Sequence, residues 1–219
     1  MNENTHKLAV TIWNYKGGVG KSTISLVLAE IAAQQGLRVL ALDLDEQQNL
    51  AHTLTLADTL FPNINVRSAL AHTFAEENFD FFILDTHPSK DNIILEALKF
   101  ADIVLIPILG DYHSIINLRS VFNYVTAAGV GQGQIAIIKN SMTALKISAE
   151  VEQVLDEQGY PSAGKLPRSN ILIRNIASGY RWDKSMQLRQ REPFLHLYSN
   201  IWNAFEKMCS GNFYNLWSN

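Results

Sequence analysis

The residues best suited to chemistry in this chain lie in one glycine-rich stretch between an apolar run and a helical pattern. The apolar run is Leu8–Trp13, and the helical pattern begins near Ser22. This order of strand, loop and helix is typical of a phosphate-binding loop, because glycines allow successive backbone N–H groups to point toward phosphate oxygens. The N-terminus of the following helix adds a partial positive charge. We call this stretch the phosphate loop; it reads Lys16-Gly17-Gly18-Val19-Gly20-Lys21-Ser22-Thr23.

Two lysines and one hydroxyl of the phosphate loop have separate expected tasks. Lys21 can reach the β- and γ-phosphate oxygens as a point charge, and the Ser22 hydroxyl can bind Mg²⁺. One lysine is enough for a phosphate loop, so the second lysine, Lys16, indicates a site with an additional charge to neutralise. The alternative is a glycine turn that serves packing alone.

Carboxylates follow two further apolar runs. Strand alternation places Asp43 and Asp45 on the same side of the chain, after the run that ends at Leu42. A carboxylate there could orient an attacking water or hold a metal-bound water, and the spacing alone does not decide between the two. The run Phe79–Leu84 leads into Asp85, a pattern typical of an aspartate that holds Mg²⁺ through its water shell. An aspartate after a strand is also a common helix N-cap.

Continuous apolar runs alternate with helical patterns along the chain, which predicts a parallel sheet with helices on both faces. This is the pattern of a doubly wound α/β domain, in which ligands bind beyond the carboxyl ends of the strands. The predicted strands are Leu8–Trp13, Leu37–Leu42, Phe79–Leu84, Ile103–Ile108 and Ile135–Ile138. The predicted helices are Ser22–Gln35, Gln47–Thr59, Asn92–Lys99, Ile115–Ala128, Leu145–Gln158 and Phe194–Met208.

The composition is that of an ordinary globular protein. The chain has 219 residues, of which 47% are hydrophobic and 18% charged, and we expect a single domain over residues 1–219. The single cysteine, Cys209, excludes a disulfide or a cysteine metal cluster within one chain and agrees with a cytoplasmic location. No apolar run reaches the length of a membrane span, so we expect no integral membrane segment.

The charge is uneven along the chain, although the net charge is only −3. The segment 165–191 carries seven basic residues against one acid, Asp183. Clustered cations bind DNA phosphates by releasing counterions, without reading sequence, although a solvated face is the alternative. We call this stretch the basic segment; its cations are Lys165, Arg168, Arg174, Arg181, Lys184, Arg189 and Arg191.

The predicted last helix and the tail after it, residues 194–219, are rich in aromatic side chains. The apolar positions have helical spacing up to Met208, and Lys207 is the cation beside them. A membrane-surface helix normally carries several cations along its polar face, so this pattern favours packing against the core. The apolar side chains concerned are Ile201, Trp202, Phe205, Met208, Phe213, Tyr214 and Trp217.

Taken together, these residues resemble the ParA/MinD family of deviant Walker A ATPases, and most closely its short ParA-type plasmid partition members. The leading lysine of the phosphate loop separates this family from most other phosphate-loop proteins. The resemblance extends from about Leu8 to Gly179. The matching stretches, in order, are KGGVGKST, LALDLDEQQN, FFILDTHPS, IVLIPIL, IIKN and LPRSNILIRNIASG.

The resemblance implies an ATPase whose two protomers enclose two ATP molecules with Mg²⁺. Lys16 of each protomer would reach the partner's phosphates, while Lys21 and Ser22 would be the loop lysine and the Mg²⁺ ligand. Asp45 matches the aspartate that positions the attacking water. The remaining matches are Gly17, Gly18, Val19, Gly20 and Thr23 along the phosphates, Asp43 and Asp85 near the metal, and Asn140, Pro167 and Arg168 around the adenine.

The resemblance also implies a use for the switch. In its ATP state the homodimer would bind nonspecific DNA, associate with the nucleoid, and position a plasmid or other cargo with a ParB-like or other adaptor protein. The first alternative is a MinD-like ATPase that works on a membrane or a protein scaffold. The second is an ATP-dependent small-molecule ligase or synthetase of the same fold, which would be expected to lack Lys16. The expected DNA contacts are Lys165, Arg174, Arg181, Lys184, Arg189 and Arg191.

The sequence departs from the family pattern in three places. Glu46 stands where a proline usually follows the hydrolytic aspartate, and His87 stands where the family commonly has proline. Asp111-Tyr112-His113 is not the usual sequence after the predicted fourth strand. We expect none of the three to touch the phosphate loop, so ATP binding should be unaffected, and the departures bear on the rate of hydrolysis and on its stimulation by a partner. His87 is either a sensor or proton carrier beside Asp85, or a surface or packing residue.

Overall fold

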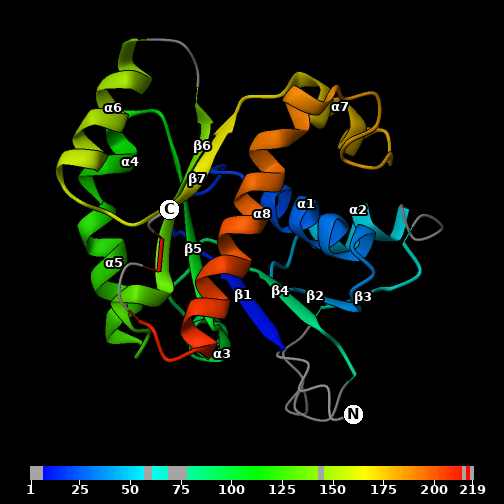
Figure 1. The fold of residues 1–219 in the computed structure, drawn as a ribbon, viewed down its shortest axis with the longest axis horizontal. Helices are drawn as coiled ribbons and strands as arrows, with labels where there is room; N and C mark the ends of the chain where they lie inside the picture. Colours follow the sequence, from blue (N-terminus) through cyan, green and yellow to red (C-terminus); the bar gives the residue numbers. More distant parts are fainter. Residues whose placement is uncertain (1–6, 57–60, 69–77, 143–145, 214–215, 218–219) are drawn as a thin grey trace.

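The computed structural model describes residues 7–56, 61–68, 78–142, 146–213 and 216–217. Within this part of the chain, a seven-stranded sheet has the order β3-β2-β4-β1-β5-β6-β7 (Figure 1). Every neighbouring pair of strands is parallel. The predicted doubly wound α/β class is therefore confirmed. The strands are β1 Leu8–Ile12, β2 Val39–Asp43, β3 Ile64–Arg67, β4 Phe81–Asp85, β5 Ile103–Leu109, β6 Ile135–Met142 and β7 Ser162–Pro167.

Helices cover both faces of the sheet, as Figure 1 shows with α4, α5 and α6 on one side and α1, α2 and α8 on the other. Side chains of β5 alternate between the two layers, with Leu105 packed toward α1 and α8 and Ile106 toward α3 and α5. The helices are α1 Lys21–Gln34, α2 Asn49–Leu56, α3 Asn92–Phe100, α4 Tyr112–Ile116, α5 Leu118–Ala127, α6 Lys146–Glu157, α7 Asn170–Ala177 and α8 Leu188–Cys209.

The central strand β1 positions the phosphate loop. β1 lies between β4 and β5 and is buried along its whole length. The loop leaves its carboxyl end and leads into α1, which is buried at nearly every position up to Ala33. Because both flanking elements are embedded in the core, the loop between them is held at the edge of the sheet where a ligand would bind.

Several predicted boundaries were wrong. The edge strands β3 and β7 and the short helix α7 were not predicted, because β3 is half exposed and β7 contains Gly164 and Lys165. The predicted helix Ile115–Ala128 is two helices that meet at Asn117. Of the predicted helices Gln47–Thr59 and Leu145–Gln158, residues 57–59 and 145 lie outside the described residues.

The last helix begins at Leu188 and not at the predicted Phe194. Gln187 and Gln190 form a capping box at its start, and Pro193 lies inside the helix, where it removes one backbone hydrogen bond. The basic segment therefore runs from β7 through α7 into the first turn of α8.

The apolar positions of α8 pack against the sheet, as the sequence favoured. Ile201 is 0% and Phe205 6% exposed, and the Trp202 ring lies 6.1 Å from the Phe81 ring. In the tail, Phe213 is exposed, while Tyr214 lies outside the described residues. Over the described ranges, no helix combines the length and the apolar character needed to cross a membrane.

A buried carboxylate links α1 to the loop between α7 and α8. Glu30 is fully buried, and its Oε2 accepts a hydrogen bond of 2.9 Å from the backbone N–H of Trp182. Its Oε1 has no hydrogen-bond partner among the described residues. Burial raises the pKa of Glu30 to about 7 from an ordinary 4.5. Because the folded state holds this proton more tightly than the unfolded chain, the contribution of Glu30 to stability falls as pH rises from 4.5 to about 7.

We therefore expect Glu30→Gln to stabilise the protein above neutral pH. Gln has the shape of the protonated carboxyl and does not ionise, so the gain is on the order of 2 kcal/mol near pH 8 and vanishes near pH 4. Urea unfolding at both pH values measures it, with the exposed Glu192→Gln as control. A gain that is the same at both pH values would contradict this account.

Candidate nucleotide-binding site

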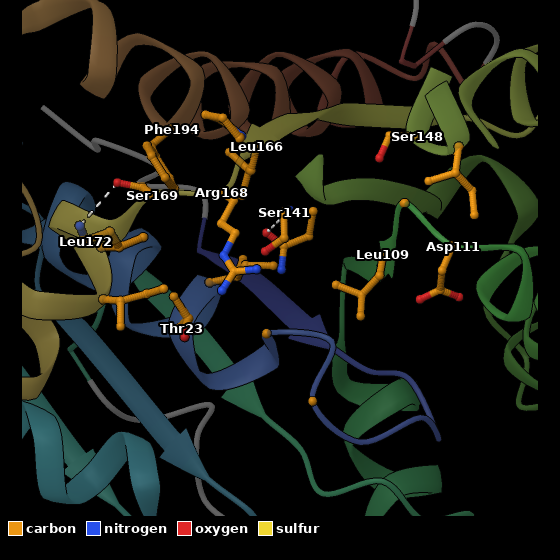
Figure 2. A pocket seen from close by; sticks show the side chains of 18 residues that line it. Thr23, Leu109, Asp111, Ser141, Ser148, Leu166, Arg168, Ser169, Leu172 and Phe194 are labelled. Carbon is orange, nitrogen blue, oxygen red and sulfur yellow. Dashed lines mark hydrogen bonds between the residues drawn. The ribbon is translucent and has the colours of Figure 1, made fainter. Parts of the chain in front are cut away.

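A cavity of about 520 Å³ opens beside the phosphate loop at the carboxyl ends of the strands. Figure 2 shows the Arg168 side chain reaching into it from the loop that follows β7. The aliphatic side chains of Leu166, Leu172 and Ile173 form an apolar part of the wall. A mixed apolar and polar cavity of this size is typical of a nucleotide-sized ligand site. Of the predicted ATP-binding residues, Gly18, Gly20, Thr23, Asn140, Pro167 and Arg168 line it.

The phosphate loop has a conformation that requires glycine. Gly18 and Gly20 have φ angles of 73° and 91°, in the left-handed region. A Cβ atom at Gly20 would also collide with Nδ2 of Asn140. That Nδ2 donates a hydrogen bond of 2.7 Å to the Val19 carbonyl, so Asn140 at the end of β6 fixes the loop. The structure thus gives Asn140 a contact with the loop that sequence reasoning did not anticipate.

Lys21, Ser22 and Asp85 come together at the start of α1. Asp85 is fully buried, and its Oδ1 accepts a hydrogen bond of 3.1 Å from Ser25, one turn after Ser22. Burial raises the pKa of Asp85 to about 7, although the Ser22 hydroxyl opposes this shift. Burial likewise lowers the pKa of Lys21, against the attraction of Asp85 and Asp45. Ser25 could have been found from its i,i+3 spacing to Ser22.

The donor set around Asp85 fits a magnesium ion. Oδ2 of Asp85 is buried and makes no hydrogen bond within the described residues. A carboxylate and a serine hydroxyl are oxygen ligands of the kind that Mg²⁺ prefers, with water and phosphate oxygens completing the shell. In the described ranges, no group of three or more His, Cys, Asp or Glu side chains could hold a metal.

Asp43 lies at the same register as Asp85 on the neighbouring strand. Both of its oxygens accept backbone hydrogen bonds, one of 3.1 Å from Asp45 and one of 2.8 Å from Ala51. Asp43 therefore orients the segment that leads into α2. Asp45 is half buried within that segment, and its Oδ1 accepts a hydrogen bond of 3.0 Å from Gln47. The two carboxylates predicted from alternation thus lie together but have different partners.

Lys16 is held by an acidic residue of its own chain. Its Nζ lies 3.2 Å from both carboxylate oxygens of Asp111 and 3.3 Å from Oγ of Ser114. Asp111 also caps α4 by accepting a hydrogen bond of 2.8 Å from the Ser114 N–H. The expectation that the unusual residues after β5 do not touch the phosphate loop was therefore wrong, because the adjacency of β1 and β5 brings Asp111 to Lys16.

Several of the predicted DNA-contact residues make ion pairs or ring contacts within the chain. Lys165 pairs with Glu152 at 2.6 Å, and Arg181 and Arg191 share the buried Asp183 at 3.0 and 3.4 Å. Nζ of Lys184 lies over the Tyr180 ring. Arg174 on α7 and Arg189 on α8 are exposed, and neither makes an ion pair with the described residues. Five of these six cations are exposed and Arg191 is half buried, but only Arg174 and Arg189 make no ion pair or ring contact with the described residues.

The sequence profile of the CobQ/CobB/MinD/ParA nucleotide binding domain matches residues 10–181. The chain is 28% identical over 140 residues to the chromosome-partitioning ATPase Soj of Thermus thermophilus, which is 48% of this chain and 56% of that protein. It is 32% identical over 162 residues to the septum site-determining protein MinD of Helicobacter pylori, which is 68% of this chain and 56% of that protein. The chain thus spans little more than half the length of either relative.

The fold agrees with this match. The structure of MinD from Pyrococcus horikoshii complexed with Mg-ADP superposes with a TM-score of 0.72 at 17% identity. The superposition covers 96% of this chain and 100% of that one. At this identity the likeness supports the shared fold and says nothing further about ligands.

We expect Gly20→Ala to weaken nucleotide binding at least tenfold. Left-handed backbone costs alanine about 1–2 kcal/mol, and the new methyl would displace Asn140 from the loop. Titration calorimetry with ADP and Mg²⁺ measures the effect. Gly129→Ala is the control. Gly129 has a φ of 99° with open space around it, so the substitution introduces the same backbone strain without a steric collision. If Gly20→Ala and the unaltered protein bind ADP with equal affinity, the phosphate loop is not part of the nucleotide-binding site.

Proposed function

The chain belongs to the CobQ/CobB/MinD/ParA nucleotide-binding family, and on that premise we propose that it is a Mg²⁺-dependent ATPase that switches between states to position cargo. The observation that carries the proposal is the buried, partnerless Oδ2 of Asp85 beside Lys21 and the phosphate loop. An anionic nucleotide with its cation would complete this charge arrangement. The partitioning role of the Soj relative and the septum-site role of the MinD relative support a positioning function for this chain.

In the proposed mechanism, backbone N–H groups of the phosphate loop and Lys21 bind the phosphates. Ser22 and Asp85 would hold Mg²⁺, which would supply positive charge to neutralise the charge that develops on the phosphates. Asp45 orients a water whose oxygen attacks the γ-phosphorus. The bond to the β,γ-bridging oxygen breaks, and ADP and inorganic phosphate form. Arg168, Pro167 and Asn140 border the base.

ATP-dependent homodimerisation is part of the proposal. Two exposed apolar side chains, Ile147 and Ile173, line the cavity, and Ile116 on α4 is 72% exposed. Exposed apolar groups gathered in this way mark interaction surfaces. Lys16 would leave Asp111 and bind the phosphates held by the partner, so that the ion pair within one chain competes with the contact between chains.

In this proposal the ATP-bound dimer binds nonspecific DNA, and a ParB-like or other adaptor protein stimulates its ATP hydrolysis. Arg174, Lys184 and Arg189 are among the exposed cations that support this, and dimerisation would double their number on one particle. Binding through phosphates without base contacts suits a protein that must move over DNA of any sequence.

We expect Asp45→Ala to lower kcat for ATP about 10²-fold, because the water loses its orienting carboxylate. ATP binding persists, so the variant accumulates as a dimer in ATP by light scattering. The control Glu96→Ala removes the same charge from an exposed position on α3 and keeps kcat. If Asp45→Ala turns over like the unaltered protein, Asp43 becomes the candidate instead.

We expect the double variant Arg174→Ala/Arg189→Ala to bind duplex DNA more weakly in the ATP state. The slope of log affinity against log salt should fall by about 2, since each lost phosphate contact contributes nearly one unit. Fluorescence anisotropy at several salt concentrations measures it. The matched control is Lys99→Ala/Arg119→Ala, which removes the same charge from exposed positions on α3 and α5. The same slope in both double variants would place the DNA surface elsewhere.

A further inference from the structure

His87 bridges two loops of the site. It lies between β4 and α3, with a half-buried side chain. Its Nδ1 is 2.8 Å from the Leu44 carbonyl oxygen, and its Nε2 is 2.6 Å from Oδ2 of Asp91. A carbonyl oxygen can only accept, so Nδ1 carries a hydrogen and donates to Leu44. The imidazole thus joins the segment after β2 to the start of α3.

The Leu44 backbone is held on both sides by the segment that begins at Asp85. The N–H of Leu44 donates a hydrogen bond of 2.8 Å to the Asp85 carbonyl, and its own carbonyl accepts from His87. Its side chain is buried with Leu42 and Leu84. Leu44 directly precedes Asp45, so these contacts set the direction in which the chain enters that residue.

The other side of the bridge is a rigid support. Asp91 caps α3 through a hydrogen bond of 3.1 Å from the Ile94 N–H and also accepts one of 3.0 Å from Ser89. The indole Nε1 of Trp13, at the end of β1, donates to the Ser89 carbonyl at 3.0 Å. Residues 86–91 are therefore tied to the strand that leads into the phosphate loop.

The remaining hydrogen bonds of Asp45 do not reach the loop after β4. Its N–H donates to Oδ1 of Asp43 at 3.1 Å, which ties its backbone to the end of β2. Its carboxylate accepts from Gln47, and its carbonyl accepts from Gln48. Both partners belong to the same short segment and would move with it. Within the described residues, this segment is therefore joined to the loop after β4 by the two backbone hydrogen bonds of Leu44. The bond nearer to Asp45 is the one between the Leu44 carbonyl and His87.

We propose that His87 is a positioning residue for ATP hydrolysis, which holds Asp45 in place through the hydrogen bond from Nδ1 to the Leu44 carbonyl. The proposal rests on the ATPase function proposed above and on the role of Asp45 in it. The family pattern has proline at this position. Proline has no side-chain donor, so it cannot make a hydrogen bond to the Leu44 carbonyl. A displacement of about 1 Å can cost up to 10²-fold in rate, so one tether of this kind is enough to matter.

The two nitrogens of His87 can be tested separately. The amide nitrogen of asparagine takes the place of Nδ1, so His87→Asn keeps the donor to Leu44 and loses the contact with Asp91. The longer His87→Gln places its amide near Nε2, so it keeps the reach to Asp91 and loses the donor to Leu44. The control is His196→Asn on the exposed face of α8.

The measurements are kcat and KM for ATP, with ADP affinity and amide hydrogen exchange of residues 44–50. We expect His87→Asn to stay within about threefold of the unaltered kcat, and His87→Gln to fall about tenfold or more. KM and ADP affinity stay within about twofold in both. Exchange in residues 44–50 accelerates only in His87→Gln.

Each other outcome overturns the proposal. Equal losses in both variants would mean that ring packing or the Asp91 contact matters, and equal retention or a faster His87→Gln would mean that the bond does not position Asp45. If the unaltered protein binds ADP but does not hydrolyse ATP, the ATPase proposal fails. In that case hydrogen exchange still decides whether His87 holds the segment.

Discussion

The site depends on two carboxylates that end neighbouring strands at the same register. Because β4 lies between β1 and β2, Asp43 and Asp85 are brought side by side, and burial raises the pKa of both. Two buried like charges need compensation. Backbone N–H groups supply it for Asp43, whereas Asp85 has Ser25 on one oxygen and nothing among the described residues on the other. A cation bound at Asp85 would lie at the end of the sheet where Lys21 and the phosphate loop meet.

Three tethers then give the surrounding loops their shape. Asn140 holds the phosphate loop at Val19, and Asp111 holds Lys16. His87 holds the segment between Asp43 and Asp45. Each tether reaches from a different strand end, so the site is an assembly of separate loops whose positions depend on one another. A ligand that competes for Lys16 would release one of these tethers, which is a physical basis for a switch.

Much of this could be predicted from the sequence. Buried parallel strands are continuous apolar runs, so β1, β2, β4, β5 and β6 were predicted, and the phosphate loop follows from their order. The edge strands β3 and β7 were missed because their polar residues are tolerated where one side faces solvent. The pair of Lys16 with Asp111 depends on the adjacency of β1 and β5, which sequence spacing does not contain. Two arginines of the basic segment share Asp183, a pairing that the sequence count did not show, and the DNA contacts themselves stay a prediction.

The most direct test of the account is binding to a random-sequence DNA duplex in four states: without nucleotide, with ADP, with ATP and with a nonhydrolysable ATP analogue, each at two salt concentrations. The account predicts tight, salt-sensitive binding with ATP and the analogue alone, because the proposed dimer forms only around the triphosphate. Absence of binding in every state, or equal binding in all four, would contradict it.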